Sequence, residues 1–147
     1  MQKRLGVLTT TVVKSLDEHY DDILLGVQGM GRGEEYMAEL MSGIHDGTLT
    51  LILLCDAGVP IGATCYETNY NCNTEEYYAT HVFMYIKPEY RGGGLASALD
   101  AALQAEAKRT DHVRVCYTIP HGELEGLVGL LNQWGYHSRY TTYTKEL

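Results

Sequence analysis

Three consecutive glycines, Gly92–Gly94, stand between a strand-like run and a helix-like run, and they constrain the fold more than any other feature of the chain. The apolar run before them ends at Ile86, and the helical pattern behind them begins at Leu95. Glycine has no side chain to cover its backbone, so its N–H groups can turn toward an anion. A helix that begins directly behind such a turn adds unpaired first-turn N–H groups and the positive end of its dipole. The segment Arg91–Ala96 therefore predicts a cradle for a pyrophosphate.

The string Pro88-Glu89-Tyr90-Arg91-Gly92 and the residues behind it resemble the acyl-CoA site of the GNAT family of N-acetyltransferases. The family motif has Gln or Arg, any two residues, Gly, any residue, and Gly or Ala, and Arg91, Gly94 and Ala96 fill it. The strand–turn–helix context agrees with that motif. The resemblance in element order covers almost the whole chain, and it implies acetyl-CoA as the acyl donor.

The resemblance also implies which residues hold the donor. The end of the strand at Ile86 would offer backbone groups to the pantetheine arm, across a splayed gap beside the strand predicted at 113–119. An N–H group at Ile86 or next to it would polarise the thioester carbonyl, and Ser97 would add a hydroxyl unless it is merely solvated. We expect Arg91 to act more through its backbone than through its charge. The residues assigned to the donor are Met84, Ile86, Arg91, Gly92, Gly93, Gly94, Leu95, Ala96 and Ser97.

The base that takes a proton from the acceptor amine is missing from its usual place. Many members of the family carry a Glu six positions before the apolar residue that ends this strand, and here that position is Thr80. The neighbouring His81 has an ordinary pKa of about 6.5, which suits the removal of a proton near neutrality. Strand alternation turns His81 away from the face of Thr80, Val82 and Met84 unless a bulge intervenes. His81 is therefore the candidate catalytic residue. The alternative is that His81 is purely structural, and that a water chain takes the proton or the amine is already neutral.

The general acid is also absent from its usual position. Relatives often have a Tyr four residues before the Gly-aromatic pair that closes the last helix. Gly135-Tyr136 matches this pair, but the Tyr position holds Leu131. The acid would then be Tyr117, His121 or Tyr143, or the thiolate would leave unprotonated, since a thiol with a pKa near 8.5 is a tolerable leaving group.

Hydrophobic periodicity predicts an α/β (α+β) fold with a single domain over residues 1–147. We expect a GNAT-like central sheet of about six strands, mixed and mostly antiparallel, flanked by four helices and splayed to admit acyl-CoA. The predicted strands are Leu5–Thr11, Leu49–Cys55, Ile61–Thr68, Tyr77–Ile86, Val113–Ile119 and Tyr136–Thr144, with a hairpin turn at Asp56–Pro60. The predicted helices carry Tyr20–Val27 with Ser15 as N-cap, Glu34–His45 stopped by Gly47, Leu95–Arg109, and Gly122–Trp134. A glycine-rich connection from Gly26 to Gly33 follows the first of them.

Charge and cysteine content exclude several classes of function. The formal net charge of −8 disfavours nucleic acids, a charged tRNA included, and acidic membranes. It favours a cationic or neutral amine as substrate, although a solvated negative surface explains it equally well. No apolar run is long enough for a bilayer, and no secretory apolar core follows Met1, so we expect a cytoplasmic protein with no membrane partner. The four cysteines are scattered without zinc spacing, so we expect reduced thiols and no metal.

The sequence thus predicts an acetyl-CoA-dependent N-acetyltransferase that transfers directly to a primary amine of a small molecule or protein. Cys116 has no His at a spacing that would activate it, which disfavours an acetyl-enzyme. A non-catalytic GNAT-fold module that binds CoA or a protein partner is the alternative. The missing Glu and Tyr favour that alternative, and the intact glycine turn opposes it. The acceptor is not identified by any motif, and a homodimer stays open.

Overall fold

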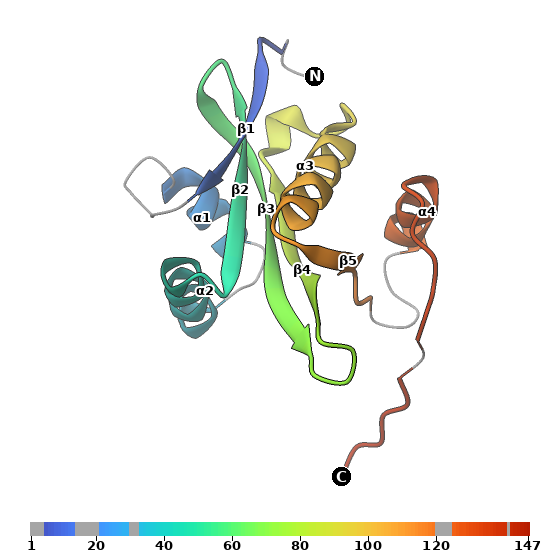
Figure 1. Ribbon diagram of the computed structural model, residues 1–147. Coiled ribbons are helices and arrows are strands. Elements are labelled where there is room, and N and C mark those ends of the chain that lie inside the picture. Colours follow the sequence, from blue (N-terminus) through green and yellow to red (C-terminus); the bar gives the residue numbers. More distant parts are fainter. Residues whose placement is uncertain (1–4, 14–20, 30–32, 120–124, 141) are drawn as a thin grey trace.

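A computed structural model describes residues 5–13, 21–29, 33–119, 125–140 and 142–147 (Figure 1). The five strands form one sheet in the order β1-β2-β3-β4-β5. Neighbouring strands are antiparallel except β4 and β5, which are parallel. The elements are β1 (Leu8–Val13), α1 (Asp21–Gln28), α2 (Glu34–Asp46), β2 (Leu49–Asp56), β3 (Val59–Asn71), β4 (Glu76–Ile86), the 3₁₀ helix η2 (Pro88–Tyr90), α3 (Leu95–Arg109), β5 (His112–Cys116) and α4 (Glu125–Gln133). The predicted mixed α+β architecture is confirmed, with five strands in the described part of the chain instead of about six.

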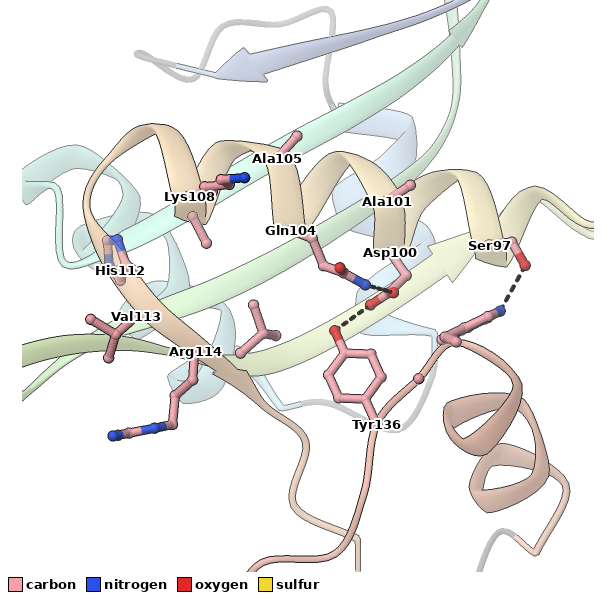
Figure 2. A pocket seen from close by; sticks show the side chains of 14 residues that line it. Ser97, Asp100, Ala101, Gln104, Ala105, Lys108, His112, Val113, Arg114 and Tyr136 are labelled. Atoms are coloured by element: carbon pink, nitrogen blue, oxygen red, sulfur yellow. Dashed lines mark hydrogen bonds between the residues drawn. The ribbon is translucent and has the colours of Figure 1, made fainter.

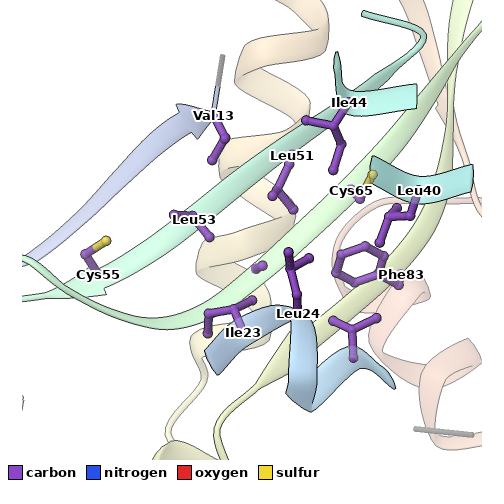
Figure 3. Packing of buried hydrophobic residues seen from close by; sticks show 12 residues of the cluster. Val13, Ile23, Leu24, Leu40, Ile44, Leu51, Leu53, Cys55, Cys65 and Phe83 are labelled. Carbon is purple, nitrogen blue, oxygen red and sulfur yellow. The ribbon is translucent and has the colours of Figure 1, made fainter. Parts of the chain in front are cut away.

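The two faces of the sheet are covered by different helices. Figure 1 shows α1 and α2 on one side, and α3 on the other with α4 beyond it. Along β2 the side chains alternate, so that Leu51 and Leu53 pack with α1 and α2 while Ile52 and Leu54 pack with α3. A strand with both faces buried reads as a continuous apolar run, as this one does. Figure 3 shows the larger cluster, which contains Val13, Ile23, Leu24, Val27, Leu40, Ile44, Leu51, Leu53, Cys55, Ala63, Cys65 and Phe83.

Glycines end helix α2 and help to form the turn between β2 and β3. The hairpin between β2 and β3 turns at Ala57 and Gly58, whose φ angles are 49° and 83°. Two successive positive φ angles are typical of the tight turn that matches the twist of an antiparallel pair. The C-cap of α2 is Gly47, with a φ of 87° and its N–H bonded to the carbonyl of Gly43. The predicted hairpin and the predicted helix stop are both confirmed.

The prediction of a last strand over Tyr136–Thr144 is wrong for the residues that the structure describes. Neither 136–140 nor 142–147 has strand structure, and Figure 1 shows the C-terminal segment leading away from the sheet. Tyr and Thr favour strands locally, but a strand also needs a partner backbone for its hydrogen bonds. Tyr136 is half-buried, and the described side chains after it are exposed, with Tyr143 92% accessible. The Tyr- and Thr-rich composition predicted a strand here, but the described residues of the segment do not pair with another strand.

Other boundaries differ by a few residues. The first strand begins and ends later than predicted because its pairing with β2 runs from Leu8↔Asp56 to Val13↔Leu51. The strand predicted at Val113–Ile119 ends at Cys116. Gly26, predicted in the glycine-rich connection, lies inside α1. A Cβ atom on Gly26 would lie 2.3 Å from Cζ of Tyr85, so the glycine allows the helix to approach β4. The predicted N-cap Ser15 and the predicted helix start at Gly122 lie outside the described residues.

Candidate active site

The glycine turn leaves the start of α3 open to an anion. Gly92 and Gly94 have φ angles of 86° and 75°, in the left-handed region that favours glycine. Gly94 is the N-cap of α3, and no side chain caps the helix there. A Cβ atom on Gly94 would meet no heavy atom within 4 Å, so space lies in front of the turn. Free first-turn N–H groups, positive φ angles and open space together fit a pyrophosphate.

Two side chains predicted for the donor site hold the turn in place. Arg91 donates from Nε to the carbonyl oxygen of Ile86 at 2.8 Å, and its guanidinium lies 5.7 Å from the ring centre of Tyr85. Ser97 accepts a hydrogen bond from Nε1 of Trp134 at 2.8 Å, which ties α3 to the segment behind α4 (Figure 2). These contacts are consistent with a cradle made by backbone amides.

The splay predicted between two strands lies next to this turn. The register of β4 and β5 runs through Tyr77↔His112 and Ala79↔Val115 to Thr80↔Cys116, where β5 ends. Within the described residues, β4 continues to Ile86 without a strand partner on that side. We call residues 81–86 the splay. Backbone groups along the splay need hydrogen-bonding partners, and an amide-bearing arm such as pantetheine can supply them.

A bulge in β4 lies directly after His81. Cys65 pairs with Phe83 but Tyr66 pairs with His81, so Val82 is the extra residue. Val82 and Phe83 both pack toward α1 and α2. His81 is the register partner of Tyr66, which packs toward α3. His81 therefore still faces away from Thr80 and Val82, and the bulge brings only Met84 to its side, where Met84 packs toward α3.

The imidazole of His81 is desolvated and stacked. Its ring lies 4.2 Å from the ring of Tyr117 at an interplanar angle of 17°. Burial lowers the pKa of His81 from 6.5 to about 4, against the opposing effects of Asp100 and the backbone of Phe83. Its Nε2 is buried and has no hydrogen-bond partner among the residues the structure describes. His81 is therefore neutral at neutral pH and a weaker base than a free histidine.

A buried carboxylate that the sequence analysis missed connects the elements around the splay. Asp100 on α3 is 2% exposed, and it accepts hydrogen bonds from the hydroxyls of Tyr117 at 2.7 Å and Tyr136 at 2.9 Å. Its second oxygen accepts from Nε2 of Gln104 at 2.6 Å (Figure 2). Burial and the charge of Asp100 raise the pKa of both tyrosines above the ordinary value, so both stay protonated. The signal available in the sequence was an Asp beside Leu99 within the apolar stripe of α3.

Of the two alternative acids that the structure describes, Tyr117 lies at the splay, where its ring stacks on His81. Tyr143 lies in the exposed C-terminal segment, and His121 lies outside the described residues. Leu131, at the usual Tyr position, is 8% exposed. A groove of about 850 Å³ runs between α3 and β5, and its polar lining includes Asp100, Gln104, Lys108, Arg114 and Tyr136 (Figure 2).

A second cavity lies on the opposite face of the sheet, between α2 and strands β3 and β4. Its volume is about 230 Å³. Its lining contains two carboxylates, Glu39 on α2 and Glu67 on β3, together with Tyr36 and Val82.

The described part of the chain has no group of three metal-binding side chains, and none of its helices is long and apolar enough to cross a membrane.

The comparisons with known proteins agree on one fold. The model of the acetyltransferase (GNAT) family matches residues 14–136. A ribosomal-protein-alanine N-acetyltransferase from Brucella melitensis biovar Abortus 2308 superposes with a TM-score of 0.74 at 15% identity, over 96% of this chain and 99% of that one. A predicted acetyltransferase with acetyl-CoA from Clostridium acetobutylicum has a TM-score of 0.71 at 13% identity, over 95% and 96%.

An aminoglycoside acetyltransferase from an uncultured soil metagenomic sample, in complex with sisomicin, has a TM-score of 0.72 at 7% identity, over 95% of this chain and 96% of that one. At such identities the likeness is one of fold. A comparison with curated protein sequences finds no match.

Proposed function

The chain belongs to the GNAT acetyltransferase family, and we propose that it transfers an acetyl group directly from acetyl-CoA to a primary amine of a small molecule or protein. It is an N-acetyltransferase with acetyl-CoA as the acyl donor. One observation carries the proposal of direct transfer at this site: the splay leads into the glycine turn and the uncapped start of α3. That continuity offers the thioester arm and the pyrophosphate consecutive backbone partners.

Direct transfer sets the proton balance that the site must meet. The acceptor arrives as an ammonium and loses one proton, and its lone pair then attacks the thioester carbonyl carbon. A C–N bond forms, the nitrogen loses a second proton, and the C–S bond breaks with its electron pair going to sulfur. The sulfur takes up one proton, so one proton is released to water in each turnover. Burial raises the pKa of the Cys116 thiol, which supports direct transfer over an acetyl-enzyme.

We propose His81 as a catalytic residue on the α3 side of the splay. A neutral imidazole there would take the proton that the nitrogen loses after attack and pass it to the sulfur. The lowered pKa of His81 favours rapid release of such a proton. His81→Ala should reduce turnover by about 10²-fold or more while acetyl-CoA still binds. Unchanged turnover and an unchanged pH profile would leave His81 with a structural role.

Donor binding is tested with two matched glycine substitutions. Gly94→Asp places a carboxylate in front of the proposed pyrophosphate site, and acetyl-CoA should no longer raise the melting temperature. Gly58→Asp is the control, because Gly58 has a similar φ of 83° and also has open space at its Cβ position. If both variants respond to acetyl-CoA like the wild type, the cradle is wrongly assigned.

The alternative, a non-catalytic module that binds CoA, predicts donor binding without turnover. Thiol release from acetyl-CoA should be measured with sisomicin, a peptide with an N-terminal Ala, L-lysine and hydroxylamine. The first two follow the acceptors named for the structural neighbours. Release with any of them, and acetylation of that amine by mass spectrometry, supports the enzyme.

Two further proposals concern the setting of the protein. We propose a cytoplasmic location, which the four free cysteines support because disulfides are rare there. A homodimer remains a separate proposal, which the mass of the purified protein in solution would test.

A further inference from the structure

We propose that Glu67 on β3 is the general base that takes the first proton from the acceptor ammonium. The inference rests on the proposed function and names the residue that replaces the carboxylate missing at Thr80. It also names the acceptor class, an amine that is cationic in solution.

The register of the sheet brings Glu67 beside Thr80. The two residues are direct cross-strand partners in the antiparallel pair of β3 and β4. Side chains of such partners lie on the same face, with Cβ atoms about 4.5–5.5 Å apart. The Thr80 hydroxyl accepts a hydrogen bond from Nδ2 of Asn69 at 2.9 Å. A carboxylate on β3 therefore stands one strand away from the place where relatives carry theirs.

Thr80 is also where the splay begins. The last register pair of β4 and β5 is Thr80↔Cys116, and the splay follows directly. A thioester held along the splay would lie next to Thr80, and so within one strand spacing of Glu67. Strands in a sheet are about 4.7–4.9 Å apart, which a Glu side chain can span directly or through one water.

Glu67 lies on the face of the sheet opposite His81. Cys65, two residues earlier on β3, belongs to the cluster packed with α1 and α2. Burial and the charge of Glu67 raise the pKa of the Cys65 thiol to about 12. The two candidate groups, Glu67 and His81, thus flank the start of the splay from opposite faces, one for each proton that the nitrogen must lose.

The cavity in front of Glu67 has the charge that an ammonium needs. The residues that line it include two carboxylates, Glu67 and Glu39, and no Lys, Arg or His. The other titratable group in its lining is Tyr36 on α2. Among the described residues no cation forms an ion pair with Glu67, and the side chain is exposed, so it can return a proton to water. Opposite charges draw the ammonium toward this lining.

The test is Glu67→Gln in the full chain, with Glu146→Gln as the control. Both variants remove one negative charge from an exposed position, and Glu146 lies in the C-terminal segment. At pH 7, kcat/KM for the best alkylamine of the panel should fall by about 10²-fold or more for Glu67→Gln and stay unchanged for Glu146→Gln. The deficit should shrink as the pH approaches the pKa of the free amine, about 10.4 for a lysine side chain. The response of the melting temperature to acetyl-CoA should be the same in all three proteins.

Hydroxylamine separates loss of the base from loss of the site. It is neutral at pH 7, so its acetylation should be little affected by Glu67→Gln. Turnover of the alkylamine within about threefold of wild type, or an equal loss with hydroxylamine, would overturn the role of Glu67 and leave the proposed function standing. If the wild type releases no thiol with any acceptor, the proposed function fails and Glu67 fails with it.

Discussion

The hydrogen bond from Tyr117 to Asp100 offers a quantitative test of how the site is held together. Tyr117 follows the end of β5, Asp100 lies on α3, and their oxygens are 2.7 Å apart. Tyr117→Phe removes the hydroxyl and keeps the ring that stacks on His81. The variant therefore isolates one hydrogen bond to a buried charge.

The expected loss of unfolding free energy depends on the hydrogen bonds that Asp100 still accepts in the variant. A hydrogen bond to a charged group contributes about 1.5–3 kcal/mol. In the variant, Asp100 still accepts from Tyr136 and Gln104, so its charge is not left without donors. We therefore expect the lower part of that range, about 1.5–2 kcal/mol of unfolding free energy. For a chain of this length that corresponds to a fall in melting temperature of about 3–8 °C.

Urea denaturation at pH 7 measures the effect, with Tyr143→Phe as control because Tyr143 is 92% exposed. The m-value should not change, since both variants expose the same surface on unfolding. A second readout is alkaline stability. Burial and Asp100 raise the folded-state pKa of Tyr117 above its ordinary value of 10, so the stabilisation is complete below pH 10 and declines as the pH rises further. The Phe variant should lose that part of the alkaline decline. A loss below about 0.5 kcal/mol at pH 7, equal to that of the control, would refute the network.

Three further predictions concern stability. Burial lowers the pKa of His81 from 6.5 to about 4, so the free energy of unfolding should fall by at most about 3 kcal/mol as the pH drops from 6.5 to 4. His81→Phe should flatten this pH dependence in urea titrations. Gly26→Ala should destabilise the protein by about 1–3 kcal/mol because its Cβ would meet the Tyr85 ring. Gly129→Ala in α4, where the Cβ position is open, should stabilise it by up to about 1 kcal/mol. If the two variants shift the melting temperature in the same direction, the packing of α1 against Tyr85 is contradicted. Leu131→Tyr should cost about 1–3 kcal/mol because Leu131 is buried, and an unchanged melting temperature would show that its site has room.

Local signals accounted for the donor side of the site. The glycine turn, the helix behind it and the apolar run before it are contiguous in sequence, and each depends on the conformational preferences of nearby residues. The helix over Leu95–Arg109 was predicted to the residue. The same local preferences gave the helix stop at Gly47 and the hairpin at Ala57-Gly58.

Features that depend on pairing between distant segments were beyond the sequence pattern. The Tyr- and Thr-rich C-terminal segment has the composition of a strand, yet among the described residues no neighbouring strand supplies its hydrogen bonds. Asp100 reads as an ordinary polar position in α3 until β5 and the chain after α4 bring two tyrosines to it. A carboxylate is acceptable in such a place only with donors around it, and those donors come from residues 17 and 36 positions away.

The sequence by itself determined the fold class, the order of elements and the glycine turn that we propose as the cradle, because these follow from periodicity and from glycine. Only the tertiary structure decided which groups lie beside the splay. The bulge at Val82 brings Met84 to the face of His81, and the register of β3 with β4 sets Glu67 beside Thr80. A shift of one residue in either would turn these side chains to the other face, since side chains alternate along a strand. Register is a property of the assembled sheet, and the chemistry of this site depends on it.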